Sequence, residues 1–179
     1  YVLVAGGSKG TEKLKGLENL LNYVDRVVIG GAMAYAFLAA KGQTIGKSKC
    51  EAEGVAAAEM ILTKAAAHKV EVVLPVDHKI VFPAKDPEFK SPTFVDEIPA
   101  EAAALDIGPK SVALFQKAIG DAKTIFWNGP MGFFEKPEFS GGTLAIARAI
   151  AEAQAVKVAG GGDTLSAIAQ FELGDRFDL

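Results

Sequence analysis

The residues best suited to chemistry form one short run, Gly160 to Thr164. Three consecutive glycines follow an apolar stretch and precede Asp163 and Thr164, where a helix is expected to begin. Adjacent glycines reduce backbone order, so they are expected where another group must approach the main chain closely. The first N–H groups of a helix attract phosphate, and Mg²⁺ is usually held by one or two carboxylates together with phosphates. The run therefore predicts a phosphate site in which Asp163 holds magnesium and Thr164 adds a hydroxyl donor; the alternative is that Asp163 only caps the helix.

Two lysines near the start of the chain could bind the same anion. The stretch "GGSKGTEKL" places Lys9 in a turn and Lys13 in the first turn of a helix, after Gly6 and Gly7. A cation at a helix N-terminus is mildly unfavourable, and a bound phosphate reverses that effect. The alternative is a pair of solvated surface lysines. The stretch matches neither the phosphate loop G-x-x-x-x-G-K-[ST] nor the fingerprint G-x-G-x-x-G, which argues against a nicotinamide cofactor.

The other glycine-bearing turns also fall where apolar runs end. They are Gly6-Gly7, Gly30-Gly31 and Gly129 with Gly132, beside Gly160 to Gly162. In an open parallel sheet, ligands bind beyond the carboxyl ends of the strands. Four such turns on one edge therefore predict a cleft where the main chain approaches a ligand, although tight turn geometry alone would explain any single one of them.

The stretch "WNGPMGFFE" adds candidate polar contacts. Asn128 is expected in a sharp turn, where its side-chain amide can meet a polar ligand. Glu135 could accept hydrogen bonds from ribose hydroxyls, as acidic groups do in other nucleotide sites, or be solvated beside Lys136. The residues alone favour the solvated Glu135. Phe133 and Phe134 are interpreted as core residues rather than as base-stacking platforms.

Positioning these residues requires alternating strands and helices. Helical spacing or Ala-rich composition separates short Val- and Ile-rich runs, which predicts parallel βαβ units. Four prolines interrupt the stretch 78–108, where loops and a small antiparallel hairpin are expected. The prediction is a single doubly wound, Rossmann-like α/β domain. Its expected strands lie in 1–7, 26–31, 70–77, 124–130 and 156–163. Its expected helices include those with helical spacing in 14–24 and 112–119 and the Ala-rich stretches 51–69 and 142–155.

Composition limits the function classes. The chain has 179 residues, 50% hydrophobic and 23% charged, with a formal net charge of −3, which favours neither a nucleic-acid nor a membrane partner. A single cysteine, Cys50, excludes an internal disulfide, and no signal peptide is visible, so a cytoplasmic location is expected. His68 and His78 are interpreted as structural because they make no ligand set for a transition metal. The chain starts at Tyr1 without methionine, inside an apolar run, and is expected to be a piece of a longer protein.

Seven motifs, in order, resemble one family over essentially the whole chain. They are "GGSKGTEK", "VVIGGAMAYAFL", "IGKS", "LPVD", "LDIGPKS", "WNGPMGFFE" and "AGGGDT". Together they resemble the C-terminal, nucleotide-binding domain of the phosphoglycerate kinase family. The resemblance implies a three-layer sandwich with a six-stranded parallel sheet. It also implies reversible, magnesium-dependent phosphoryl transfer between 1,3-bisphosphoglycerate and ADP, giving 3-phosphoglycerate and ATP in glycolysis.

The resemblance also implies roles for individual residues. It assigns Lys9 and Lys13 to the nucleotide phosphates, with Lys13 close to the transferred group and therefore catalytic. It makes Asp163 the metal ligand and reverses the interpretation of Glu135, which becomes a ribose-binding residue. The full expected nucleotide site is Gly6, Gly7, Lys9, Lys13, Gly30, Gly31, Ala104, Leu105, Asn128, Pro130, Glu135, Gly160, Gly161, Gly162, Asp163 and Thr164.

The chain also departs from the family pattern. Ala32 and Ala104 stand where glycine is usual and could narrow the adenine pocket, and Gly10 and Glu12 replace Val and Asp. The N-terminal domain that binds 3-phosphoglycerate and a final Gly-rich segment are absent. We therefore expect residues 1–179 to bind nucleotide without catalysing the full reaction, and the full-length enzyme to be a monomer. Two alternatives stay open: a non-catalytic ADP/ATP-binding module, or an unrelated α/β domain that binds another phosphorylated metabolite.

Overall fold

All five apolar runs form strands of one parallel sheet. The computed structural model describes residues 1–7 and 11–179, and its sheet has the order β3-β2-β1-β7-β8. Every neighbouring pair in this sheet is parallel. The bounds are β1 Val2–Ala5, β2 Arg26–Ile29, β3 Glu71–Val73, β7 Thr124–Asn128 and β8 Val156–Ala159.

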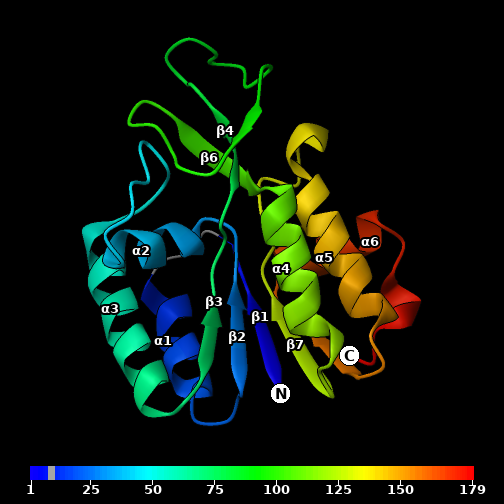
Figure 1. Ribbon diagram of the computed structural model, residues 1–179. Helices are drawn as coiled ribbons and strands as arrows, with labels where there is room; N and C mark the ends of the chain where they lie inside the picture. Colours follow the sequence, from blue (N-terminus) through cyan, green and yellow to red (C-terminus); the bar gives the residue numbers. More distant parts are fainter. Residues whose placement is uncertain (8–10) are drawn as a thin grey trace.

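Six α-helices are found in the described residues, and they cover the two faces of the sheet (Figure 1). Leu3, Val27 and Ile29 face the core beneath the first three helices, whereas Val4, Val28 and Trp127 face the core beneath the last three. This alternation follows from the two-residue period of a strand. The helices are α1 Thr11–Leu20, α2 Met33–Ala40, α3 Ala52–Ala67, α4 Pro109–Gly120, α5 Gly141–Glu152 and α6 Gly162–Gln170.

The arrangement confirms the predicted doubly wound, three-layer α/β fold, with one correction. The resemblance implied six parallel strands, but the described residues form five. The physical reason is that the sequence contains five uninterrupted apolar runs. The remaining extended segments lie in the proline-punctuated stretch 78–108 and pair in an antiparallel manner instead.

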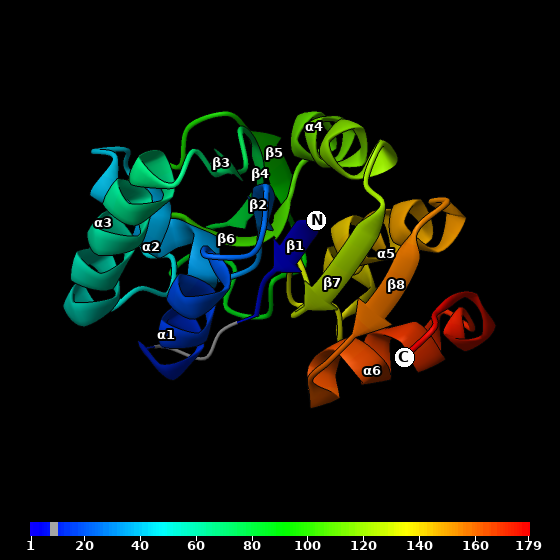
Figure 2. The same cartoon turned by 90° about the horizontal axis from the view of Figure 1, so that it is seen from below.

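The proline-punctuated stretch forms a small second sheet of order β5-β4-β6. Its strands are β4 His78–Val81, β5 Thr93–Val95 and β6 Ala103–Ile107, with a register shift between Lys79 and Ile80. The antiparallel hairpin expected in this stretch is therefore confirmed, with one further strand. The small sheet stands beyond the end of the main sheet (Figures 1 and 2), and it brings β6 to the same edge as the glycine-bearing turns.

One buried carboxylate fixes the helix that follows β6. Asp77, 2% exposed, accepts hydrogen bonds from the N–H groups of Lys110 and Ser111 at 2.9 and 2.7 Å, and from the Ser111 hydroxyl at 2.6 Å. These groups lie in the first turn of α4, where N–H groups have no partner within the helix. A residue distant in sequence thus caps α4 and attaches it to the end of β3.

A helix that crosses a bilayer must be both long and apolar. Among residues 1–7 and 11–179, no helix combines the length and the apolar character that crossing a bilayer requires.

Candidate functional site

The strand order creates a switch point at the centre of the sheet. From β1, the chain proceeds through β2 to β3 on one side and later through β7 to β8 on the other. The loops after β1 and β7 therefore depart in opposite directions, which opens a crevice at their carboxyl ends. Gly6 and Gly7 follow β1, and Gly129 and Pro130 follow β7, so the predicted cleft lies at the switch point.

The glycine turns meet main chain to main chain. The Gly7 N–H donates to the Pro130 carbonyl at 2.9 Å, and the Gly31 N–H donates to the Met131 carbonyl at 3.1 Å. Gly31 has φ +65°, and a Cβ added there would lie 2.6 Å from both the Gly7 nitrogen and the Pro130 oxygen. No side chain fits between these turns. The glycines are thus required for the close approach of the loops to one another, and the approach of a ligand to them stays a prediction.

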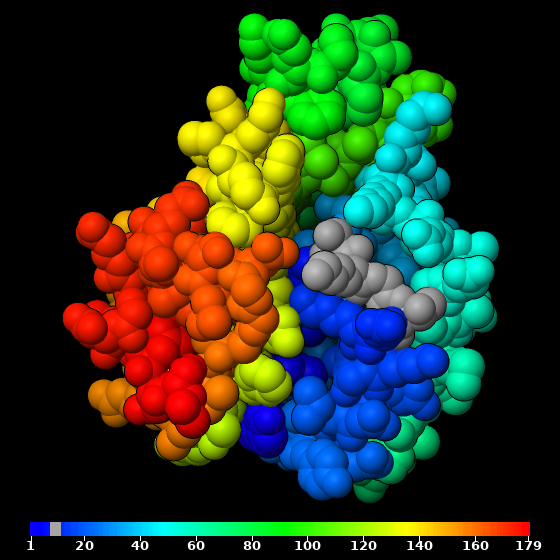
Figure 3. All heavy atoms as spheres, turned by 180° about the vertical axis from the view of Figure 1, so that it is seen from behind, coloured from blue at the N-terminus to red at the C-terminus, as the bar shows by residue number. Residues whose placement is uncertain are grey.

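Two connected cavities open at this edge, of about 690 and 410 Å³. Gly7 and Asp163 line both, so the two form one continuous site. Figure 3 shows the furrow between α1, in blue, and the β8–α6 region, in orange. The larger cavity is lined by Gly7, Gly31, Ala32, Tyr35, Lys47, Lys49, Ala103, Ala104, Leu105, Pro130, Gly132, Phe133, Glu135 and Asp163. The smaller is lined by Gly7, Glu12, Lys13, Asn128, Gly129, Gly161, Gly162, Asp163 and Thr164.

The N-terminus of α6 faces the smaller cavity. Gly161, with φ +91°, precedes the helix, and no side chain caps it. Asp163 is the second helical residue and is exposed, so the alternative that Asp163 serves as the helix cap is wrong. First-turn N–H groups and the helix dipole favour an anion at such an end. The carboxylate of Asp163 therefore remains available at the junction of the two cavities.

The side chains of Thr164 and Lys13 both lie against the loops at the switch point. The Thr164 hydroxyl, in a residue 1% exposed, accepts a hydrogen bond from the Gly129 N–H at 2.6 Å. Lys13, in the first turn of α1 as predicted, places its Nζ beside the main chain, where Cβ atoms added at Gly7 and Gly129 would lie 2.8 and 2.5 Å away. Thr164 thus fixes the loop on which the Lys13 ammonium rests.

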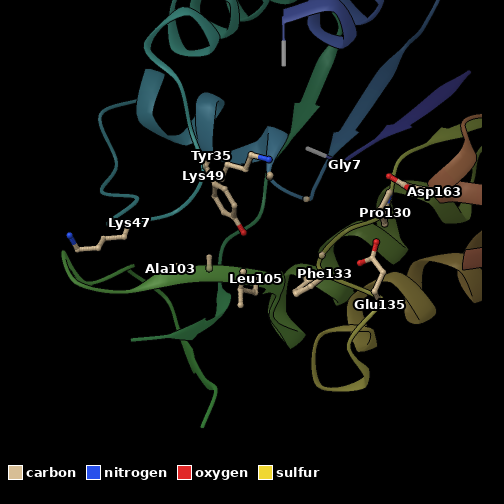
Figure 4. Close-up of a pocket in the computed structure, with 14 residues that line it drawn as sticks. Gly7, Tyr35, Lys47, Lys49, Ala103, Leu105, Pro130, Phe133, Glu135 and Asp163 are labelled. Atoms are coloured by element: carbon tan, nitrogen blue, oxygen red, sulfur yellow. The ribbon is translucent and has the colours of Figure 1, made fainter. Parts of the chain in front are cut away.

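The larger cavity has a polar side near Asp163. Glu135 is exposed and points into the cavity, beside Pro130 and Asp163 (Figure 4). Its neighbour Lys136 turns away, donates to the Glu88 carbonyl at 3.0 Å and lies 5.5 Å from the centre of the Phe89 ring. Among the ion pairs of the described residues, none joins Glu135 to Lys136, and the exposed Glu135 is compatible with both of its predicted roles. Both Glu135 and Asn128 line the site, as the sequence predicts.

Apolar groups line the remainder of the larger cavity. Ala104 is 4% exposed on β6, and Leu105 follows it. The Leu105 carbonyl accepts the Phe133 N–H at 2.8 Å, which joins β6 to the segment after β7. Phe134 is buried, as predicted, but Phe133 is 40% exposed and lines the cavity, so its interpretation as a core residue is wrong. The turn after Gly132 directs the two rings to opposite sides.

Four expected site residues line neither cavity or lie outside the described residues: Gly6, Gly30, Gly160 and Lys9. Gly6 packs against the loop after β7, where an added Cβ would meet the carbonyl oxygens of Pro130 and Gly129. A Cβ added at Gly30 would meet the side chain of Met131, and one added at Gly160 would lie 3.2 Å from the Phe126 ring. Both glycines therefore allow close packing beneath the site. Lys9 and Gly10 lie outside the described residues.

Sequence reasoning missed several lining residues. Tyr35 lies one helical turn after Ala32, and that spacing could have placed it on the same face of α2. Lys47 and Lys49 had only the "GKS" motif to indicate them. Burial raises the pKa of Tyr35 far above its ordinary value, and Asp106 raises it further, so the phenol stays neutral.

Asp106 on β6 is a buried carboxylate that lies in the motif "LDIGPKS" but for which the sequence predicted no role. It is 2% exposed and accepts hydrogen bonds at 2.9 Å from the N–H groups of Gly142 and Ile107. Burial raises its pKa to about 7, against the opposite effect of those two donors and of Lys79. Asp106 thereby attaches β6 to the start of α5 directly behind the cavity wall.

The charged groups of the site fit a magnesium ion held jointly with phosphates. In the described part of the chain, no cluster of three or more His, Cys, Asp or Glu residues could hold a metal ion by itself. Asp163 offers one exposed carboxylate beside an anion-attracting helix end. That donor set matches the usual binding of Mg²⁺ through one or two carboxylates and ligand phosphates.

Fold and site together define a class: a doubly wound parallel α/β domain with a crevice at its switch point, lined by Lys13 and the N-terminus of α6. A model of the phosphoglycerate kinase family matches residues 1–179. The chain belongs to the phosphoglycerate kinase family.

Individual relatives agree with this assignment. The phosphoglycerate kinase of Desulfosudis oleivorans is 51% identical over 177 residues, which cover 98% of this chain and 44% of that protein. That of Acidobacterium capsulatum is 46% identical over 178 residues, with the same coverage. The solved phosphoglycerate kinase of Coxiella burnetii superposes with a TM-score of 0.92 at 41% identity, over 98% of this chain and 45% of that one. The chain thus spans less than half the length of these relatives.

Proposed function

We propose that residues 1–179 form the nucleotide-binding half of a phosphoglycerate kinase. The observation that carries this proposal is the pair of connected cavities that meet at Gly7 and Asp163, one with a helix N-terminus and a lysine, the other largely apolar. An ADP or ATP molecule has the same two-part character. Its phosphates would lie in the smaller cavity and its adenosine in the larger one.

Each part of the nucleotide has groups that suit it. The N–H groups at the start of α6 and the Lys13 ammonium offer donors to the phosphates. The Glu135 carboxylate suits the ribose hydroxyls, and the surfaces of Ala104, Leu105 and Phe133 suit the base. Asp163 would hold the Mg²⁺ ion, which neutralises phosphate charge when bound.

The proposed reaction is transfer of a phosphoryl group between 1,3-bisphosphoglycerate and ADP, giving 3-phosphoglycerate and ATP. Such a transfer depends mainly on positioning and charge neutralisation. Lys13 would act at the transferred group, because its Nζ lies at the switch point beside Gly7 and Gly129. The chain covers only 44% of the length of the Desulfosudis oleivorans enzyme, so this chain alone is proposed to bind nucleotide without turnover.

Calorimetric titration of the chain with ADP, with and without magnesium, tests the proposal. Wild type should bind more tightly with magnesium, and Asp163→Ala should remove that gain. Asp175→Ala, which removes an exposed carboxylate beyond α6, is the matched control and should behave as wild type. Absence of ADP binding to wild type under both conditions would refute the proposed function. Equal magnesium gain in wild type and Asp163→Ala would refute the metal assignment.

A further inference from the structure

We propose that Lys49 makes the base end of this site prefer a purine with an oxygen at position 6, such as guanine or hypoxanthine, over adenine. The inference rests on the proposed nucleotide site and specifies the class of nucleotide that it takes. Lys49 and Lys47 both line the larger cavity, whereas the phosphates of the nucleotide are proposed to lie in the smaller one.

The main chain holds these lysines against the floor of the cavity. The Lys47 N–H donates to the Ala102 carbonyl at 2.7 Å, and the Ala104 N–H donates to the Ser48 hydroxyl at 3.0 Å. Ser48 is 8% exposed, so the second bond is buried. The residue that follows Ser48 is therefore fixed beside Ala104, the alanine that lines the apolar part of the cavity.

The charges of the cavity are divided between its two ends. The acids Glu135 and Asp163 lie at one end, and Lys47 lies at the other in Figure 4. The Lys47 ammonium is 3.8 Å from the Glu101 carboxylate on the exterior. Among the ion pairs and side-chain hydrogen bonds of the described residues, Lys49 takes part in none. Figure 4 shows its side chain beside Tyr35, above the β6 residues Ala103 and Leu105.

The chemistry of a lysine at this place discriminates between purines. An ammonium group has three donors and no acceptor. Adenine carries an amino donor at position 6, whereas guanine carries an oxygen acceptor there. A base whose sugar lay at Glu135 would extend along the cavity toward Tyr35 and Lys49, which line the same space. The proposal is that Lys49 there meets the edge that differs between the two bases. A charge-assisted hydrogen bond to the oxygen stabilises one base, and two opposed donors disfavour the other.

The test compares ADP, GDP and IDP by titration in the presence of magnesium. We expect Lys49→Met to lower the preference for GDP over ADP by about tenfold, the scale of one hydrogen bond to a charged group. IDP should follow GDP, because the two share the 6-oxygen and differ in the 2-amino group. Lys41→Met, at the end of α2 and outside both cavities, is the control and should leave the preference unchanged.

The outcomes separate this inference from the function on which it rests. If all three nucleotides bind and Lys49→Met changes their affinities by the same factor, the preference does not come from Lys49 and the inference is wrong. If Lys49→Met weakens GDP but not IDP, the effect does not come from the 6-oxygen that the two bases share, and the 6-oxygen assignment is wrong. If none of the three binds wild type, the nucleotide site itself is refuted, and this inference with it.

Discussion

Replacement of Asp106 by asparagine should change how stability depends on pH. The pKa of Asp106 is raised by burial from 3.8 to about 7 in the folded chain, so the folded state binds this proton more tightly than the unfolded state does. Stability from this group is therefore fully present below pH 3.8 and is lost as pH rises through about 7. The whole difference corresponds to at most about 4 kcal/mol, at roughly 1.4 kcal/mol per pKa unit.

Urea unfolding of wild type and Asp106→Asn at several pH values between 5 and 8 measures the effect. Asparagine keeps the shape and does not titrate. The stability of wild type relative to Asp106→Asn should fall by about 3 kcal/mol between pH 5 and 7.5 and then level off. Parallel curves for the two proteins would refute the argument, because they would mean that Asp106 titrates normally in the folded chain.

A second carboxylate provides a control of opposite sign. Asp86 is half-buried, and the N–H groups of Lys90 and Ser91 lower its pKa by hydrogen bonding at 2.9 and 2.8 Å. Its contribution to stability is present at neutral pH and is lost as pH falls. Asp86→Asn should therefore reduce the small loss of folding stability at acidic pH. Between pH 5 and 8, the dependence of stability on pH should remain that of wild type.

Substitutions at three further positions, Gly31, Thr164 and Asp77, test the structure around the site by urea unfolding, and the first two have a companion variant as control. Gly31→Ala should destabilise the fold by at least about 2 kcal/mol, because the added Cβ would be forced into the main chain at positive φ. Gly16→Ala, within α1, should stabilise the fold by roughly 0.5–1 kcal/mol, because the added Cβ has no neighbouring atom within 4 Å. Equal effects of the two would contradict the close approach of the turns. Thr164→Val should cost about 1–3 kcal/mol by leaving the Gly129 N–H without its acceptor, and Thr164→Ser should restore most of it. Asp77→Ala should cost about 3 kcal/mol through loss of the α4 cap, and an unchanged midpoint would show that the cap is dispensable.

Much of the fold could be predicted from the sequence because its signals are local. Each apolar run between helical segments became a parallel strand, and the Ala-rich stretches 51–69 and 142–155 became α3 and α5. The glycine turns followed, since the carboxyl ends of parallel strands share an edge. The sixth strand had no local signal of its own in this chain, and the described residues do not contain it.

The parts of the site that escaped prediction depend on contacts between distant residues. Lys49 reaches the cavity because Ser48 pairs with Ala104, 56 residues later in the chain. Asp106 would be read as a surface carboxylate from its own neighbours, but the Gly142 N–H, 36 residues away, makes its burial possible. Phe133 was misread because a turn, rather than a strand or helix period, sets the direction of its ring. The nucleotide contacts expected from the resemblance stay predictions that the titrations above will test.

The meeting of the loops after β1, β2 and β7 has a consequence for how the site responds to change. Its frame is made mainly of peptide groups, so its shape depends on few side chains, Thr164 among them, provided that Gly7 and Gly31 stay glycine. Selectivity for a ligand then rests on separate, replaceable side chains at the rim. Such a division would let the choice of ligand drift over generations of substitution while the architecture of the crevice persists, and it makes the rim the natural place to engineer a new preference.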